Sequence, residues 1–388
     1  MKISLPALVT LERQFGVSSS AMKFVVLAFF VSYGASIMLW GTLSDLLGRR
    51  RTLWIGFALA VTGVIVVVTS GDYWQYLIGR CIEGVGISVA TPTARALIVD
   101  VYQRKQSAMV LSKAASVTGP MPGLAPIVGG YILTFMGWRA IYIVFLVMLV
   151  CVLGLCYLRL PETHPASSRQ PRDKGIRGQI ARQKRQYGQV MRDSRFWGYA
   201  VVYYGYSGLM LGYYGAMPFW FVSQYGYRED TYAWLGVFSV GIYLISLTIA
   251  RWLMKRAQLE RLLLRSLCLS IVPIAWTLAC QLLGWVNPVS IVIAMCAWAM
   301  VTGLVFGCAN IGAVYLHKDI AGSTSAVLGS INFMLVGLFA WIESHMDMHH
   351  FWHLLLLFVV VSTCVITLNY TCVYRGFVRQ ETLDVADA

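Results

Sequence analysis

Arg80 and Glu83 stand three positions apart inside the apolar run 74–98, and this pair is the first candidate for proton chemistry. On a helix, that spacing places both side chains on one face, where they can form an ion pair. A charge inside an apolar span is costly and usually marks a transport pathway or a proton relay. Either Glu83 carries or shares a proton and Arg80 tunes its pKa, or the two residues form a self-neutralising structural pair. Both interpretations stay open.

A second charged set, Asp45, Arg49 and Arg50, follows the apolar run 21–42. Gly41 and Gly48 frame it, and glycine permits a tight reversal between closely packed helices. An acid beside two arginines at helix termini can make charge-assisted contacts that break when packed helices move. This set therefore favours a gate at the membrane surface.

A run of glycine and proline within the apolar run 107–135 offers a different property. Glycine removes side chains and proline removes backbone donors, so the segment can pack closely against another helix and can also bend. Simple close packing is the alternative interpretation. The run comprises Gly119, Pro120, Pro122, Gly123, Pro126, Gly129 and Gly130.

Aromatic and amide side chains inside other apolar runs are candidates for a substrate pocket. Tyrosine rings suit amphiphilic or cationic ligands, and asparagine can bond a substrate. The alternatives are an interfacial aromatic belt with packing, and hydrogen bonds between helices. The candidates are Tyr203, Tyr206, Tyr213, Asn310 and Asn332.

Four histidines gather at His345, His349, His350 and His353, in a predicted external turn. His349 and His353 have metal-ligand spacing if they are helical. A metal or pH-sensing site is one interpretation, but a solvated loop is the one that we expect, so no metal site is predicted.

The amino-acid composition indicates what kind of structural elements position these residues. Hydrophobic residues make up 58% of the chain and charged residues 12%, with a mean hydropathy of +0.66. A soluble domain carries about 25% charged residues, so the composition argues against a soluble enzyme. The net charge of +14 is spread over short clusters between apolar runs, which is typical of cytoplasmic loops and not of a nucleic-acid patch. No phosphate-binding G-x-x-x-x-G-K-[ST] motif is present, so ATP is not implied.

Eleven apolar runs are long enough to span a bilayer as helices, which predicts an all-α membrane protein. Residues 3–9 read as the last turns of one further helix, a stub. The basic stretch 161–195 separates two bundles, 1–160 and 196–388, in a plan of two six-helix halves. The predicted spans are 21–42, 52–69, 74–98, 107–135, 139–159, 197–219, 232–253, 262–283, 287–315, 322–342 and 351–373.

Basic residues are distributed unevenly over the predicted loops, with 23 in one alternate set and 5 in the other. Because cytoplasmic loops carry the excess of lysine and arginine, the loop after residue 42 and the C-terminus are predicted to be cytoplasmic.

Several segments resemble signatures of the major facilitator superfamily, and together they cover nearly the whole chain. Residues 41–50 resemble its loop signature G-x-L-x-D-R-x-G-R-R, with Leu46 where a basic residue is usual. Residues 80–86 resemble the R-x-x-Q-G-x-G pattern of the fourth helix, with Glu83 in place of the glutamine.

Other segments resemble the Bcr/CflA-like (bicyclomycin-resistance) drug/proton antiporters within that superfamily. Residues 95–102 resemble the end of their fourth helix, and residues 119–130 resemble their antiporter motif in its A-P-x-x-G-G form. Residues 160–163 and 321–329 resemble segments of helices six and eleven.

The N-terminus departs from this pattern. Residues 5–8 resemble the L-P-A-L that ends helix one, but Lys2 then stands where the family has an acidic residue, a favoured proton site. We expect either that the chain begins upstream of Met1 or that it lacks helix one, with Glu83 in the proton-carrying role.

The resemblance implies a multi-pass transporter of the inner membrane that exports a small organic molecule against proton entry, by alternating access. It implies proton coupling at Arg80 and Glu83. The partners expected are a small-molecule substrate and the bilayer, with no nucleic acid, no cofactor beyond the proton, and a monomeric chain. Alternatives are an importer or facilitator of the same fold and a transport-dead membrane sensor or scaffold. The implied cytoplasmic gate comprises Gly41, Asp45, Gly48, Arg49, Arg50 and Asp100.

Overall fold

The computed structural model describes most of the chain as helix, and no strand occurs in the part that it describes. That part falls into two compact units, Met1–Val190 with Gly322–Trp341, and Met191–Ala321 with Ile342–Ala388. Each unit is considered by itself. The described residues are 4, 7–102, 106, 110, 113, 121–163, 175–218, 221, 225, 229–317, 320–343 and 351–375.

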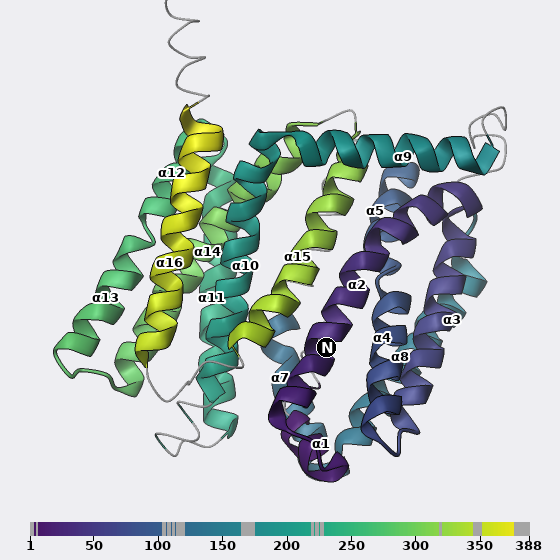
Figure 1. Cartoon of the computed structure of the whole chain (residues 1–388), viewed down its shortest axis with the longest axis horizontal. Helices are drawn as coiled ribbons and strands as arrows, with labels where there is room; N and C mark the ends of the chain where they lie inside the picture. Colours follow the sequence, from purple (N-terminus) through teal and green to yellow (C-terminus); the bar gives the residue numbers. More distant parts are fainter. Residues whose placement is uncertain are drawn as a thin grey trace, which may run out of the picture. The chain divides into compact units, whose positions relative to one another are not determined.

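The first unit contains the charged residues singled out above. Figure 1 shows its long helices α2, α3 and α15, with α9 lying across the ends of α2 and α15. The helices that lie wholly or mainly in this unit are α1 Leu8–Phe15, α2 Ser19–Leu47, α3 Arg49–Val68, α4 Tyr73–Ile87, α5 Ala90–Val101, α7 Met121–Met136, α8 Trp138–Arg159, α9 Gly175–Arg192 and α15 Ala321–Glu343.

The second unit is built around α14, which packs against α10, α11, α12 and α13. Its helices are α10 Ser194–Pro218, α11 Glu229–Leu253, α12 Leu259–Cys268, α13 Ile271–Leu282, α14 Pro288–Tyr315 and α16 Phe351–Asn369, the last extended by a π-helical turn over Tyr370–Tyr374.

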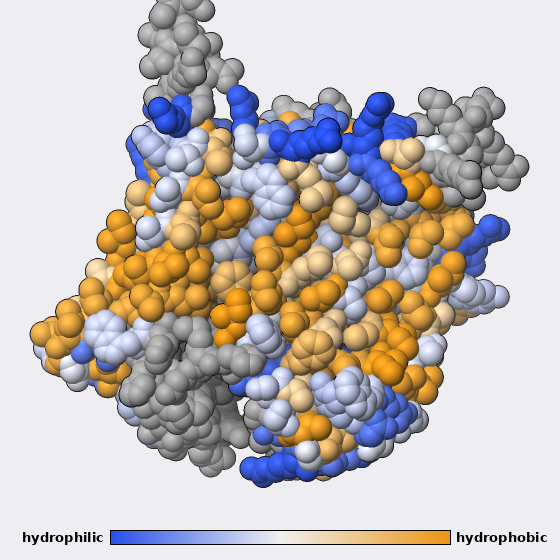
Figure 2. Space-filling view, in the orientation of Figure 1, coloured by the Kyte–Doolittle hydropathy of each residue, from blue (hydrophilic) through white to orange (hydrophobic). Residues whose placement is uncertain are grey.

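Seven helices in the described part are long and apolar enough to cross a membrane. Large apolar side chains also lie exposed on both units, for example Leu158 and Leu282. So much exposed apolar surface is unfavourable in water, whereas lipid tails solvate it. Figure 2 shows hydrophobic residues along the helices, with hydrophilic residues gathered along α9. The predicted all-α membrane fold is confirmed.

Two predicted spans are each divided into two helices. The run 74–98 becomes α4 and α5, and the run 262–283 becomes α12 and α13. Proline explains both breaks, because Pro92 and Pro273 have no backbone N–H to bond the carbonyl four residues earlier. The backbone tightens there, and the N–H of Thr91 bonds the carbonyl oxygen of Ser88 at 3.3 Å.

The N-terminal helix lies later in the chain than the stub predicted over residues 3–9. Helix α1 begins at Leu8 and ends at Phe15, where Gly16 takes a positive φ of 63° that suits a helix end. Leu11 is fully buried in the core, and the indole N–H of Trp138 donates to the Gln14 side chain at 2.6 Å. The α1 helix is therefore packed against the bundle.

The basic stretch predicted as a linker also contains an ordered helix. In α9, Gln183, Gln186, Tyr187 and Val190 form the less exposed stripe, at the i, i+3, i+4, i+7 spacing of a docked helix. The Tyr187 hydroxyl donates to the carbonyl of Met38 at 3.3 Å, and a 2.8 Å bond joins Gln186 to Ser323. Burial raises the pKa of the Tyr187 phenol. Helix α9 is thus fixed to α2 and α15.

Helices α3 and α4 approach so closely that side chains are excluded between them. A Cβ placed on Gly63 would lie 2.8 Å from the Cα of Glu83. One placed on Gly86 would lie 2.6 Å from the Cα of Ala60. Small residues at these positions let two backbones meet inside a membrane, where packing drives helix association. This contact sets the position of Glu83.

Candidate functional site

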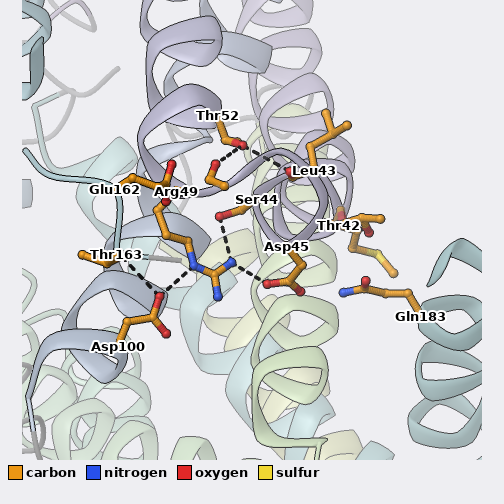
Figure 3. Close-up of polar contacts among 12 residues, drawn as sticks. Thr42, Leu43, Ser44, Asp45, Arg49, Thr52, Asp100, Glu162, Thr163 and Gln183 are labelled. Atoms are coloured by element: carbon orange, nitrogen blue, oxygen red, sulfur yellow. Dashed lines mark hydrogen bonds and ion pairs between the residues drawn. The ribbon is translucent and has the colours of Figure 1, made fainter. Parts of the chain in front are cut away.

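The guanidinium of Arg49 is the centre of a polar cluster at the turn between α2 and α3. Its Nε donates to a carboxylate oxygen of Asp100 at 2.9 Å, and its Nη1 bonds both Asp45 and the hydroxyl of Ser44. Figure 3 shows Arg49 held between Asp45 of α2 and Asp100 of α5. One arginine therefore joins three helices.

The segment after α8 completes this cluster. The backbone N–H of Arg49 donates to the Glu162 carboxylate at 2.9 Å, and the hydroxyl of Thr163 bonds Asp100 at 3.4 Å. Gly48, at a φ of 97°, makes the reversal that brings Arg49 back toward α2. Bonds from three carboxylates thus meet on one residue.

The cluster lies at the edge of the bundle. The side chain of Arg49 is 8% exposed and that of Asp100 is 22% exposed, whereas that of Asp45 is 53% exposed. Water reaches the acids, so each contact is weak enough to break and form again. That property suits a gate.

The predicted gate residues are only partly brought together. Asp45, Arg49 and Asp100 meet, but Arg50 donates to the Tyr157 carbonyl of α8 at 2.8 Å and lies over the ring of Trp54 on its own helix, α3. Gly41 instead faces Tyr187 of α9. Ser44, Glu162 and Thr163 were not predicted as members, although Glu162 lies in a segment that the family resemblance marked.

Arg80 and Glu83 form the second charged site, entirely inside the first unit. Their side chains are 1% and 2% exposed, and a guanidinium nitrogen bonds a carboxylate oxygen directly. The predicted pairing on one face of the helix is therefore present.

Aromatic rings enclose the Arg80 side of this pair. The guanidinium carbon lies 4.4 Å from the ring centre of Phe29 on α2 and 5.5 Å from that of Tyr142 on α8. The hydroxyls of Tyr142 and Tyr76 share a hydrogen bond of 2.7 Å. Aromatic faces stabilise a cation without neutralising it. Among the described residues, Glu83 therefore supplies the negative charge that balances Arg80.

The glycine–proline run over residues 119–130 falls partly outside the described residues. Gly119 and Pro120 lie outside them, and the side chains of Pro122, Gly123 and Pro126 are not described, although all three belong to α7. Gly129 is buried and Gly130 half-buried. Among the described residues, no atom of another helix lies within 4 Å of a Cβ placed on Gly130.

The predicted pocket residues do not form one cluster. On α10, the Tyr203 ring lies 4.1 Å from that of Phe306, and Tyr206 is fully buried beside Trp298. Asn310 lies on α14 in the same unit, half-buried.

Asn332 belongs to the other unit, on α15. It is buried, and its amide oxygen has no hydrogen-bond partner among the described residues. Tyr213 belongs to α10, but its side chain lies outside the described part.

A small hollow in the second unit lies beside Tyr206, between α10, α14 and α16. Its lining is apolar and aromatic, and sequence reasoning missed it because its residues come from three separate helices. The lining residues are Leu209, Met210, Met295, Trp298, Ala299, Thr302 and Phe358.

The histidine-rich turn cannot be placed. His345, His349 and His350 lie outside the described residues, and so does the side chain of His353. In the described part of the chain, no group of three or more metal-ligating side chains gathers.

Comparisons with known proteins agree with the helical fold. A family model described as Major Facilitator Superfamily matches residues 1–341. Multidrug resistance protein D of Escherichia coli is 30% identical over 172 residues, which are 44% of this chain and 43% of that protein. A bicyclomycin resistance protein homolog of Haemophilus influenzae is 25% identical over 167 residues, 43% of this chain and 42% of that protein.

The chain therefore matches less than half of the length of these two curated relatives. The crystal structure of a D-xylose-proton symporter matches more broadly, over 95% of this chain and 92% of that one, with a TM-score of 0.67 and 15% identity. At that identity the likeness concerns the fold alone. The resemblance drawn from the sequence motifs is confirmed by the family model and the drug-resistance relatives.

Proposed function

Because the chain belongs to the Major Facilitator Superfamily and is a multi-pass membrane transporter, we propose that it exports a small organic molecule in exchange for protons. The site of action is the bacterial inner membrane, with the C-terminus in the cytoplasm. The chain works as a monomer and uses no cofactor other than the proton.

Export is supported by the relatives. Two proteins with similar sequence are named for multidrug resistance and bicyclomycin resistance. A membrane transporter can give such resistance by moving the compound outward, and we transfer that direction to this chain as part of the proposal.

Proton coupling rests on one observation, the buried pair of Arg80 and Glu83. Protonation of Glu83 removes the negative charge and leaves a buried cation between Phe29 and Tyr142. An uncompensated buried charge costs about 3–5 kcal/mol. A conformation that relieves this cost is favoured when Glu83 is protonated, which couples proton binding to a change of shape.

The arrangement of α2 gives that change a route. Phe29 on α2 touches Arg80, and the same helix ends with Asp45, which bonds Arg49. A shift of α2 that follows protonation at Glu83 would therefore reach the cluster at the other end of the helix. In this proposal, the Arg49 cluster is the gate and the Arg80–Glu83 pair is the switch.

Everted membrane vesicles test the proposal. Vesicles that contain the full chain are energised so that their lumen becomes acidic, and the pH gradient is followed with acridine orange. Ethidium or 2-naphthoate is then added. We expect an exported probe to enter the lumen and to discharge part of the gradient, whereas vesicles without the chain show neither effect.

Each part of the proposal has its own contradictory result. Probe accumulation that persists when a protonophore collapses both the pH gradient and the membrane voltage contradicts proton exchange. Probe movement out of the everted lumen, driven by the gradient, contradicts export and indicates an importer.

A further inference from the structure

Helix α5 carries Arg95, the second arginine of the apolar run 74–98 after Arg80. Arginine within a membrane-spanning segment is rare and usually pairs with an acid or marks a pathway. The side chain of Arg95 is exposed in the structure. This residue has no part in the switch or the gate described above.

The charges of the first unit show why Arg95 stands apart. Arg49 is balanced by Asp45 and Asp100, and Arg80 is balanced by Glu83. Arg95 has no ion pair and no hydrogen bond among the described residues. The cation therefore lacks a balancing acid in the described part of the chain.

Asp100 is the nearest acid along α5, but it is already engaged. Both Arg49 and Thr163 bond its side chain. Asp100 stands five residues after Arg95. At about 100° per residue, the two side chains point about 140° apart around the axis of α5. Recruiting Asp100 to Arg95 would dismantle the Arg49 cluster.

Polar groups of Thr91 and Tyr33 lie on the face of α5 that carries Arg95, and aromatic rings lie next to Tyr33. Arg95 follows Thr91 by four residues, so both side chains lie on one face of α5. The hydroxyls of Thr91 and Tyr33 share a 2.8 Å hydrogen bond, and the Arg95 charge acts electrostatically on Tyr33. The face that carries Arg95 is thus turned toward α2.

Further aromatic rings lie next to Tyr33. The ring of Tyr33 lies 4.5 Å from that of Phe333 on α15, and Phe333 stacks on Phe30 at 6.3 Å. A cation beside aromatic rings matches a ligand with an anionic end and an apolar body. The guanidinium fork can bond both oxygens of a carboxylate or sulfonate.

We propose that Arg95 recognises the anionic group of the transported substrate, and that this substrate is an organic anion with an apolar or aromatic body. The inference rests on the proposed function and specifies the class of molecule exported. The balancing charge of Arg95 then arrives with the substrate and leaves with it.

Binding to the purified full chain in a neutral detergent tests this directly, since it needs neither a gradient nor a direction. Three ligands share one ring system and differ in charge: 2-naphthoate, 2-naphthamide and 2-naphthylmethylammonium. Calorimetry gives each Kd. The wild-type chain should bind naphthoate best, and Arg95→Gln should weaken naphthoate binding by about tenfold or more while leaving the other two unchanged.

Two variants serve as controls. Arg95→Lys keeps the charge but loses the planar fork, so an intermediate Kd for naphthoate is expected. Arg51→Gln removes an equal charge from an exposed position at the start of α3 and should bind naphthoate as the wild type does. Apparent Tm without ligand, measured with a thiol-reactive dye on the free cysteines, checks that every variant is folded.

Three results overturn the proposal: no naphthoate binding to the wild-type chain, equal naphthoate affinity in Arg95→Gln, or tighter binding of the cationic ligand. A lipid phosphate is the other source of an anion. If phosphatidylglycerol in nanodiscs, and not naphthoate, gives the Arg95-dependent stabilisation, Arg95 is a lipid anchor and the proposal falls. Naphthoate binding without pH-driven export would contradict the proposed function alone.

Discussion

Arg49 and Arg80 lie in the same unit and each bonds a carboxylate, but Arg49 bonds acids of two other helices, whereas Arg80 bonds an acid of its own helix. Arg49 shares its bonds among Asp45, Asp100 and Ser44, and the side chain of Asp45 is 53% exposed. Arg80 is 1% exposed and is balanced by Glu83 beneath aromatic rings.

The difference in exposure to water gives the two ionic sites different roles in a conformational change. A partly exposed cluster loses little when one bond opens, because water replaces the lost partner. A sealed pair loses far more when one charge disappears, because water does not reach the charge that remains. The same residue type therefore serves as a reversible contact in one place and as a two-state switch in the other.

The largest effect should come from breaking the sealed pair. Arg80→Met leaves Glu83 buried without its cation, so the free energy of unfolding should fall by about 3–5 kcal/mol. The double variant Arg80→Met with Glu83→Met should recover most of that loss, since no charge is then buried. Thermal unfolding in detergent measures both; a double variant less stable than Arg80→Met would contradict the picture of a balanced buried pair.

A second way to disturb the Arg80–Glu83 pair is to add a side-chain atom that clashes with the backbone of Glu83. Gly63→Ala places a Cβ 2.8 Å from the Cα of Glu83, and such overpacking costs about 1–3 kcal/mol. Gly154→Ala is the matched control, because no atom lies within 4 Å of that Cβ. The apparent Tm should fall for Gly63→Ala only. Equal values for both variants would show that the contact of α3 with α4 does not hold Glu83 in place.

The gate should respond less in stability than the switch. Asp100→Asn removes one of several partners of Arg49 at a partly exposed site, and such pairs are worth about 0–1 kcal/mol. Stability should therefore change little, while the rate of probe export changes, because the cluster no longer closes as before. A stability loss as large as that of Arg80→Met would remove the distinction between the two sites.

The two sites also differ in how far the sequence could predict them. The spacing of Arg80 and Glu83 was enough to place them on one face, because the pairing is local to one helix. The Arg49 cluster needed Glu162, which is 113 residues away along the chain; only the family resemblance marked that segment. Its role as a partner of the Arg49 backbone depends on packing that no local pattern encodes.

Other departures have similar causes. Pro92 and Pro273 indicate the helix breaks in the sequence, since proline has no N–H for the helical hydrogen bond. The breaks were not predicted because each proline lies within a continuous apolar run. Helix α9 was hidden inside a basic stretch, although its stripe of Gln183, Tyr187 and Val190 follows helical spacing. Asn332 was grouped with residues of the other unit because apolar runs give no information about which helices meet.

The decisive measurement is pH-driven transport by Glu83→Gln, with Asp100→Asn beside it, in proteoliposomes and with whichever of ethidium and 2-naphthoate the wild-type chain exports. Glutamine keeps a hydrogen-bonding group but cannot release a proton. We predict that Glu83→Gln exchanges labelled for unlabelled probe at near the wild-type rate, yet fails to accumulate probe under an imposed pH gradient. Accumulation at the wild-type level in a folded Glu83→Gln chain would contradict the assignment of proton coupling to the buried pair.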